Sequence, residues 1–390
     1  MVNNVEYNFD EQINRKNTNC AKYDGLKRYF GYTDLNPLWV ADMDFKTPDF
    51  INNAIIETAK NSLYGYSIDS DEIYESIINW QKNQHQWNIN KEDIYMINGV
   101  VPAYSACIEA FSDIGDEVIV QTPIYPPLFK CVTANDRVVV VNELKNDNGY
   151  YTMDLEDLES KITPKTKILA LCSPHNPVGR VWSKEELEKV ADICIKHNII
   201  IVSDEIHSDI TFKKFTPLAS ISQKIANQTI TLNSAGKTFN IAGLNSAYAI
   251  SKNVDILNKF KKIAQKREIQ SINFFGYIAT KAAYENGAVF VEELKKYLLS
   301  NIEFTKNYFE KNNMKIDFFT PEATYLLWLD FSKYNLSHNE IKDILLTKSK
   351  IALNDGVSFG SNGKCYFRLN LALSQNALEI ALNQLFQEFK

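Results

Sequence analysis

The sequence lacks the features that mark several classes of protein. Its six cysteines are scattered, with no paired CxxC spacing of the kind that holds zinc or forms a redox dithiol, so no metal site is predicted. No uninterrupted apolar run approaches the ~20 residues that a membrane helix needs. The opening sequence MVNNVEYNFDEQINRK also has no apolar signal-peptide core. We therefore expect a cytoplasmic protein with no membrane partner.

A large excess of one charge is missing as well. The 42 basic and 48 acidic residues leave a net charge of −6, and no basic block of the kind that grips nucleic-acid phosphates is present. Apolar residues make up 45% and charged residues 23%, which is ordinary globular usage. Nucleic acid is therefore not expected as a partner. At roughly 150 residues per domain, the 390 residues suggest two or three domains, and two is our working number.

Short apolar segments rich in β-branched residues alternate with segments of helical period between about residues 92 and 251. This alternation predicts βαβ units and a mostly parallel sheet of seven strands. Helices must cover both faces, because nearly all of these strands are too apolar to have a wet face. The predicted strands cover residues 93–97, 117–121, 137–141, 167–172, 199–204, 229–233 and 247–251.

The pattern changes after about residue 285. A long helical stretch is followed by apolar strands at 324–331 and 367–373 and by a closing helix. This change predicts a second, smaller α+β domain, so the expected fold class is α/β with a large sheet domain sandwiched by helices. The large domain is predicted to cover residues 46–285, and the small domain residues 1–45 and 286–390.

Polar residues that directly follow the predicted strands are candidates for a binding site, because open parallel sheets bind ligands beyond the carboxyl ends of their strands. Asn98, Gly99 and Val100 follow the first strand, where a glycine lets backbone N–H groups approach a phosphate; most such glycines only make the turn. Asn176 lies between two prolines that would restrict its backbone. A plain proline-rich turn is the alternative there.

Two charged residues also follow strands. Asp204 ends a very apolar strand, where a carboxylate is costly unless it meets a cation or several hydrogen-bond donors. Lys237, in the segment SAGKTFN, follows the strand at 229–233. A lysine near a buried site loses its proton more easily, which suits Schiff-base chemistry. Taken alone, an S-x-x-K pattern is common and has no fixed meaning.

The order of these residues along the chain is more specific than any one of them. In this order the sequence resembles the fold-type I pyridoxal-phosphate enzymes of the aminotransferase class I/II group, along essentially its whole length. The matching positions are Asn98-Gly99, Tyr125, Asn176-Pro177, Asp204, Ser234-x-x-Lys237 and Arg368. Within that group the chain looks like the MalY/PatB-type carbon-sulfur β-lyases. The segments that carry this likeness are WVADMDFKTP (39–48), SPHNPVGRVW (173–182), SDEIHSD (203–209), KTFNIAGL (237–244), PEATYLLWLDF (321–331) and FRLNLA (367–372).

The resemblance implies pyridoxal 5'-phosphate as the cofactor and gives five residues a role toward its ring. Lys237 would hold the cofactor as a Schiff base and then act as general base on the substrate α-proton. Asp204 would pair with the pyridine nitrogen, and Asn176 would donate to the phenolic oxygen. Tyr125 would stack on the ring, with ordinary packing as the alternative. His207 stands where many relatives have tyrosine, and it has either a contact to the cofactor or a structural role.

Other residues would hold the phosphate and the substrate. Gly99, Val100 and Ser234 would contact the phosphate, and Tyr64 would reach it from the partner subunit, which implies a homodimer with shared active sites. Arg368 would bind the substrate α-carboxylate with its two-pronged guanidinium. Many aminotransferases carry a phosphate-binding arginine where this chain has Asn245, a departure that points away from ordinary aminotransferases.

The implied reaction is an α,β-elimination on a sulfur-containing amino acid of the cystathionine or cysteine type, giving pyruvate, ammonia and a thiol. The alternative is an aminotransferase, since both reactions begin with removal of the same α-proton. A non-catalytic regulatory protein on the same fold is a third hypothesis. The presence of Lys237, Asp204 and Arg368 together weighs against it, because a scaffold has no need of them.

Overall fold

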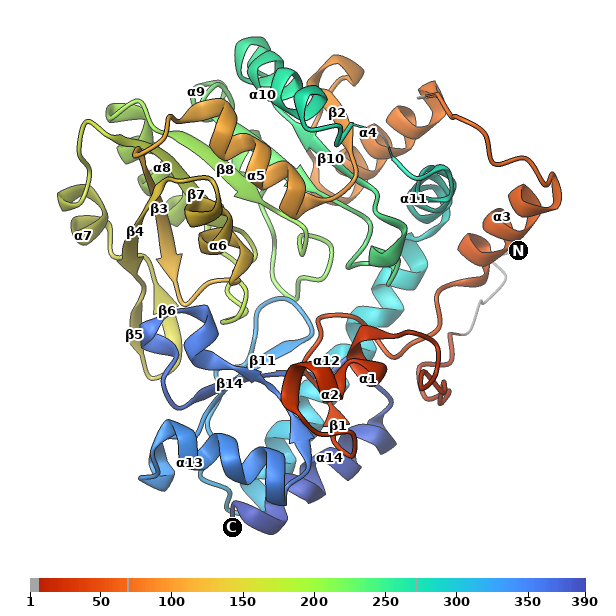
Figure 1. The fold of residues 1–390 in the computed structure, drawn as a ribbon, viewed down its shortest axis with the longest axis vertical. Coiled ribbons are helices and arrows are strands. Elements are labelled where there is room, and N and C mark those ends of the chain that lie inside the picture. The colour runs from red at the N-terminus through yellow and green to blue at the C-terminus, as the bar shows by residue number, and fades with distance from the viewer. Residues whose placement is uncertain (1–6, 69, 271) are drawn as a thin grey trace.

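The computed structural model describes residues 7–68, 70–270 and 272–390, and its centre is a seven-stranded sheet (Figure 1). The strand order is β2-β10-β9-β8-β7-β3-β4. Only β10 runs antiparallel to its neighbours in this sheet, so the prediction of a mostly parallel seven-stranded sheet is confirmed. The strands are β2 (Ile94–Ile97), β3 (Glu117–Thr122), β4 (Val138–Glu143), β7 (Thr166–Cys172), β8 (Ile200–Asp204), β9 (Thr229–Asn233) and β10 (Ala247–Ile250).

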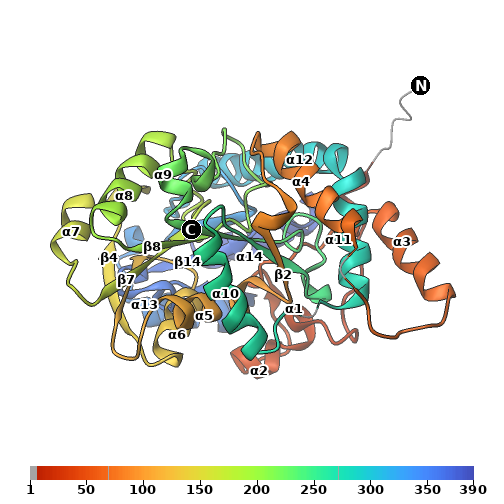
Figure 2. The same cartoon turned by 90° about the horizontal axis from the view of Figure 1, so that it is seen from above.

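Helices cover both faces of this sheet, because its central strands are buried on both sides. One face packs against α5 (Val100–Phe111), α6 (Pro127–Ala134) and α10 (Val254–Lys266). The other face packs against α7 (Leu155–Ser160), α8 (Lys184–Lys196) and α9 (Gln223–Ala226). Figure 2 shows the two helical layers with the sheet between them. The edge strand β4 is the exception, with Val138 half exposed.

Three further helices pack together beside β2, at the other edge of the sheet (Figure 1). They are α3 (Asp49–Lys60), α4 (Asp71–His85) and α11 (Phe274–Asn286). The segment 61–68 between α3 and α4 is exposed and rich in apolar side chains. Leu63, Tyr64, Tyr66 and Ile68 all present most of their surface to solvent.

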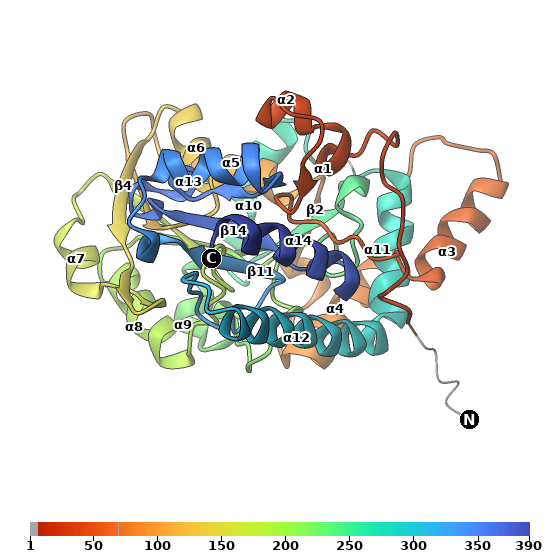
Figure 3. The same ribbon diagram turned by 90° about the horizontal axis from the view of Figure 1, so that it is seen from below.

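The second body is built on a three-stranded antiparallel sheet in the order β11-β14-β13. Its main elements follow the predicted sequence of long helix, strand, strand and closing helix. They are α12 (Ala288–Lys311), β11 (Leu326–Asp330), α13 (His338–Asp343), β13 (Asn354–Asp355), β14 (Tyr366–Asn370) and α14 (Gln375–Glu388). The helix α12 is tied to the chain after β14 by Asn301, whose amide donates to the carbonyls of Leu371 and Leu373 (Figure 3).

The N-terminal part of the chain joins this second body. β1 (Asn36–Pro37) pairs in parallel with β12 (Ile351–Ala352), and the short helices α1 (Ala21–Asp24) and α2 (Leu26–Phe30) precede it. An antiparallel hairpin of β5 (Lys145–Asp147) and β6 (Tyr150–Thr152) follows the edge strand β4 of the large sheet. The fold class is therefore as predicted, while the boundaries 46–285, 1–45 and 286–390 stay a prediction. In the described part of the chain, no helix is long and apolar enough to cross a membrane.

Candidate active site

The candidate residues gather where the carboxyl ends of three adjacent strands meet the small sheet. Asp204 is the last residue of β8, Asn176 lies in the loop after β7, and Lys237 lies in the loop after β9. Arg368, in the middle of β14, donates from Nη1 to Asn176 Oδ1 at 3.0 Å. Residues separated by almost two hundred positions therefore form one site between the two sheets.

The half-buried amine of Lys237 lies at the centre of this site. Its Nζ donates to the carbonyl oxygen of Ala41 at 2.7 Å, and the hydroxyl of Tyr325 donates to the same carbonyl at 3.0 Å. Burial and the charge of Arg368 lower the pKa of Lys237 to about 8, although Asp42 and Asp204 act in the opposite direction. A useful fraction of this amine is therefore neutral near pH 7, as a nucleophile or base requires.

Asp204 is a buried carboxylate with few partners. Among the residues described, the backbone N–H of Ile206, at 3.2 Å, is its hydrogen-bond donor. Burial raises its pKa to about 6, and the Ile206 N–H and the charge of Lys237 only partly offset this. A carboxylate left in this state is stabilised by any cationic N–H group that binds against it.

Arg368 is a buried cation without a carboxylate partner in the described ranges. Its guanidinium donates to Asn176 Oδ1 and, from Nη2, to the carbonyl oxygen of Trp39 at 3.0 Å. Its Nε has no partner among the residues that the structure describes. Burial lowers its pKa to about 10, which still leaves it charged at neutral pH. The hydrogen bond to Arg368 uses the oxygen of the Asn176 amide and leaves its nitrogen free to donate to a ligand. The pair can therefore bind an anion and an acceptor oxygen side by side.

Tyr125 and His207 border the same space. Tyr125 follows β3 at the same edge of the sheet. Burial raises its pKa and the charge of Asp204 adds to this, whereas the charge of Arg368 acts in the opposite direction. His207 is buried, and burial and the charges of Lys237 and Arg368 lower its pKa to about 3, so it is neutral. Its ring lies 6.2 Å from that of Tyr325, and its Nδ1 has no partner in the described part of the chain. His207 therefore borders the site, but its contacts within the described residues assign it no role.

The residues predicted to hold a phosphate lie at the same edge. Gly99 is the N-cap of α5 and Val100 its first residue, so the free N–H groups of the first turn present a positive helix end. The hydroxyl of Ser234 donates to Ser246 O at 2.6 Å and accepts from Gly236 N at 2.9 Å. It is thus already bonded within the chain, with one lone pair left for a further donor.

Tyr64 and Asn245 do not join this cluster as strongly. Tyr64 is 65% exposed in the segment before α4, and its hydroxyl is bonded at 3.3 Å to Ala59 O. Asn245 is exposed and has a left-handed backbone at the end of a short helical turn. Within one chain the predicted site residues other than Tyr64 therefore lie at this edge of the large sheet or on β14, and Asn245 is exposed.

Residues 39–44 contribute main-chain groups that sequence reasoning did not identify. Trp39 O accepts from Arg368, and Ala41 O accepts from Lys237 and Tyr325. The segment was noticed as part of WVADMDFKTP, but a motif does not reveal which backbone carbonyls point inward. Asp209 was also missed: it is buried five residues after Asp204 and accepts from Thr238, the neighbour of Lys237.

These features fit a flat ligand that carries a positive and a negative group. The site offers a carboxylate lacking a cation, an amine of lowered pKa, and a helix end open to an anion. Buried atoms without partners in the described chain lie around it, namely Asn98 Oδ1, Thr122 Oγ1, His207 Nδ1 and Arg368 Nε. A pyridinium N–H would pair with this carboxylate, an aldehyde would react with the amine, and a phosphate would bind at the helix end.

Comparisons with known proteins agree with this arrangement. The profile of the family "Aminotransferase class I and II" matches residues 37–385. The chain is 37% identical over 381 residues to cystathionine beta-lyase PatB of Bacillus subtilis, covering 97% of this chain and 98% of that protein.

Solved structures are similar over the whole chain. A PLP-bound protein of Clostridium difficile 630, assigned provisionally as an aminotransferase, has 42% identity and a TM-score of 0.96, with 99% of this chain and 100% of that one covered. The PLP-bound C-S lyase of Staphylococcus hominis has 31% identity and a TM-score of 0.93, with 99% of both chains covered. The chain is therefore a member of the aminotransferase class I and II family.

Proposed function

We propose that the protein is a pyridoxal-phosphate-dependent carbon-sulfur β-lyase. The observation that carries this proposal is the half-buried amine of Lys237, which lies in one site with Asp204 and Arg368. Neither of these two has an ion-pair partner among the residues that the structure describes. The choice of a lyase is supported by relatives that are named as cystathionine beta-lyases or C-S lyases and are similar over nearly the whole chain.

Each part of the cofactor has a group to hold it. Lys237 would bind the aldehyde carbon, and Asp204 would accept a hydrogen bond from the protonated pyridine nitrogen, which in turn would lower the raised pKa of this carboxyl. Asn176 would donate from its free amide nitrogen to the phenolic oxygen. Tyr125 would pack on the ring, and the first turn of α5, from Gly99 and Val100, would receive the phosphate together with Ser234.

When bound, pyridoxal phosphate supplies a ring that withdraws the electron pair left by removal of an α-proton. The chain supplies the other parts of the reaction. Arg368 orients the substrate by its α-carboxylate, and Lys237 removes the α-proton with an amine whose pKa of about 8 suits a base near neutral pH. The β-carbon then loses a thiolate. Overall, one amino acid with a sulfur on its β-carbon and one water give a thiol, pyruvate and ammonia.

An aminotransferase is the second candidate. It has the same requirements for Lys237, Asp204 and Arg368, and it is favoured by the provisional assignment of the Clostridium difficile protein at 42% identity. The departure at Asn245 favours the lyase, because an arginine there would add a charged contact to the phosphate. A regulatory protein without catalysis would gain nothing from burying Asp204 and Arg368 with no ion-pair partner in the described ranges, since each charge is costly to bury.

The proposed assembly is a homodimer in which Tyr64 of each subunit completes the site of the other. It is supported by the exposed apolar side chains Leu63, Tyr64, Tyr66 and Ile68, which form a patch unsuited to solvent. A reducing, cytoplasmic location is supported by the cysteines, all six of which are free.

A product assay tests the proposed reaction. Purified protein loaded with pyridoxal phosphate is incubated with cystathionine in the absence of any keto acid, and pyruvate, ammonia and free thiol are measured. The lyase predicts all three in equal amounts. If pyruvate is absent and an amino group is transferred once a keto acid is added, the aminotransferase replaces it. If neither occurs over a panel of sulfur-containing and ordinary amino acids, the catalytic proposal is wrong.

A further inference from the structure

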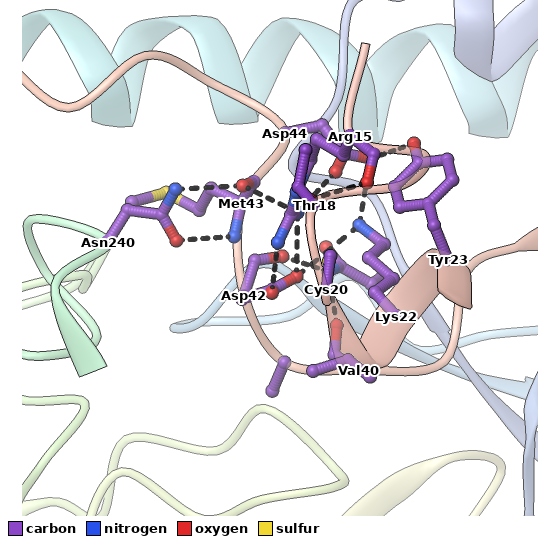
Figure 4. Close-up of polar contacts among 12 residues, drawn as sticks. Arg15, Thr18, Cys20, Lys22, Tyr23, Val40, Asp42, Met43, Asp44 and Asn240 are labelled. Carbon is purple, nitrogen blue, oxygen red and sulfur yellow. Dashed lines mark hydrogen bonds and ion pairs between the residues drawn. The ribbon is translucent and has the colours of Figure 1, made fainter. Parts of the chain in front are cut away.

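Four charged residues form a cluster where residues 15–24 meet residues 39–44 (Figure 4). We call residues 39–44 the strap and residues 15–24 the arm. Arg15, from the arm, grips Asp42 with both prongs, at 3.1 Å and 2.6 Å, and also reaches Asp44 at 2.6 Å. Lys22, whose side chain is fully buried, lies 2.8 Å from Asp44 and 3.7 Å from Asp42. Two cations of the arm therefore neutralise two carboxylates of the strap.

The electrostatics of this cluster show that its members are tightly coupled. Burial alone would lower the pKa of Arg15, but hydrogen bonds and charge from Asp42 and Asp44 reverse the effect and raise it. The hydroxyl of Tyr23 also donates to Asp44, at 3.1 Å, and burial and this carboxylate raise its pKa. Bidentate arginine pairs of this kind fix geometry as well as charge.

The strap is also the element that touches both functional cations of the active site. Its carbonyls at Trp39 and Ala41 accept from Arg368 and Lys237, respectively. The arm contacts it a second time, because the carbonyl of Lys22 accepts from Trp39 Nε1 at 3.0 Å.

Side chains from two other elements hold the backbone of the strap. The amide of Asn370 donates to the carbonyls of Val40 and Asp42, at 2.6 and 2.5 Å. The amide of Asn240 accepts from Met43 N at 3.0 Å and donates to Met43 O at 2.8 Å. The arm thus adds ionic contacts to a segment that is already aligned with the site.

We propose that Arg15 and Lys22 are positioning residues, which hold the strap so that Ala41 and Trp39 orient Lys237 and Arg368, and which neutralise Asp42, the residue that follows Ala41 in the chain. This inference rests on the proposed function, because it concerns the same site. The charged and titratable groups around Lys237 are Arg368 from β14, Asp204 from β8, His207 from the loop after β8, Tyr325 just before β11, and Asp42 from the strap. Of these, Asp42 is the one whose charge is balanced by the arm.

The charge part of the proposal is tested by a pair of variants with opposite predictions. In Arg15→Gln a positive charge is removed, so the pH at which the absorbance of the bound cofactor changes should rise by about half a unit. In Asp42→Asn a negative charge is removed, and the same midpoint should fall by a similar amount. The double variant should return close to the original value, and Arg28→Gln, at an exposed arginine of α2, should not move it.

A role limited to stability predicts another outcome. Both single variants would then unfold more easily while the absorbance midpoint stayed in place or moved in one direction for both, and the proposal would be overturned. Arg15→Lys should restore part of the shift, because it restores the charge but not the two-pronged contact.

The positioning part is measured without any cofactor signal. Hydrogen exchange at the amides of Met43 and Asp44, which donate to Asn240 and to Ala372 O, should be about tenfold faster in Arg15→Gln and unchanged in Arg28→Gln. Equal exchange rates in all variants would contradict the proposal that the arm holds the strap. If the protein binds no pyridoxal phosphate at all, the proposed function fails, while this exchange experiment still decides whether the arm holds the strap.

Discussion

Asp204 and Asp209 are two buried carboxylates on the same short segment, and their surroundings are opposite. Asp209 accepts from Trp80 Nε1 at 2.9 Å, His85 Nε2 at 2.8 Å and Thr238 Oγ1 at 2.7 Å. Burial would raise its pKa, but these partners more than offset that effect and lower it. Asp204 has the single N–H of Ile206 in the described chain, and burial raises its pKa to about 6.

The difference separates a structural carboxylate from a functional one. Asp209 is satisfied by the chain itself and ties α4 to the residue that follows Lys237. Asp204 is left with a cost that only a bound group can relieve, and strong pKa perturbation of this kind is characteristic of active sites. The same contrast holds for two arginines. Arg368 has no acid partner in the part of the chain that the structure describes, whereas Arg180, which is equally buried, pairs with Glu186 and Glu322.

The largest loss of activity is expected when the amine of Lys237 is removed. Lys237→Ala should fold and yet lose the absorbance of the covalently held cofactor, with turnover reduced roughly 1000-fold or more because nucleophile and base are both removed. Absorbance spectra and pyruvate release measure this. Lys262→Ala, at an exposed lysine of α10, is the control and should behave as the unaltered protein. An active Lys237→Ala protein would show that the amine is not needed for the reaction. Asp204 would then have no functional role that distinguishes it from Asp209.

The next effect compares the two carboxylates directly. Asp204→Asn should reduce kcat about 100- to 1000-fold, because the amide cannot hold a proton on the pyridine nitrogen. Asp209→Asn should leave kcat much closer to the original value, since its contacts reach the site only through Thr238. Steady-state kinetics at saturating cofactor test this, and equal losses of kcat in both variants would show that Asp209 also acts in the reaction.

A smaller effect is expected for the two buried arginines. Arg368→Lys should raise KM for the amino acid about 10- to 100-fold with a lesser change in kcat, because a single ammonium replaces a two-pronged contact to the carboxylate. Arg180→Lys should lower the urea midpoint of unfolding and leave KM unchanged, as its partners are internal acids. A normal KM in Arg368→Lys would place substrate binding elsewhere.

The smallest effect concerns stability of the cofactor-free protein against pH. The pKa of Asp204 is raised to about 6 from 3.8, so the folded state binds its proton more tightly and stability falls as pH rises from 4 to 6. The free energy of unfolding of Asp204→Asn, relative to that of the unaltered protein, should therefore rise by about 2 kcal/mol from pH 4 to pH 7. Asp209 has a lowered pKa, so the stability that its ionised form contributes is fully present only above the ordinary carboxyl pKa. Asp209→Asn should therefore lose a nearly constant amount between about pH 5 and pH 7.

Urea unfolding at several pH values measures both differences. A pH-independent difference for Asp204→Asn would mean that Asp204 is already satisfied within the chain, and the contrast with Asp209 would then disappear.

The seven strands of the large sheet were predictable, because buried parallel strands leave continuous apolar segments whose ends can be found in the sequence. The positions of Asp204, Asn176 and Lys237 followed, since each comes directly after such a strand. The strands β1, β12 and β13 were not, as two residues are too short to show alternation. The ion pair between Arg15 and Asp42 could not be predicted either, because the two residues are 27 positions apart and nothing in the sequence assigns one arginine to one acid.

The central claim is that Lys237 binds the cofactor, and a chemical trap tests it most directly. The protein is loaded with pyridoxal phosphate, reduced with borohydride so that an imine becomes a stable secondary amine, digested, and mapped by mass spectrometry. We predict a phosphopyridoxyl group on the peptide that contains Lys237, and none after the Lys237→Ala change. A label on another lysine, or no label on a protein that is nevertheless active, would contradict the account.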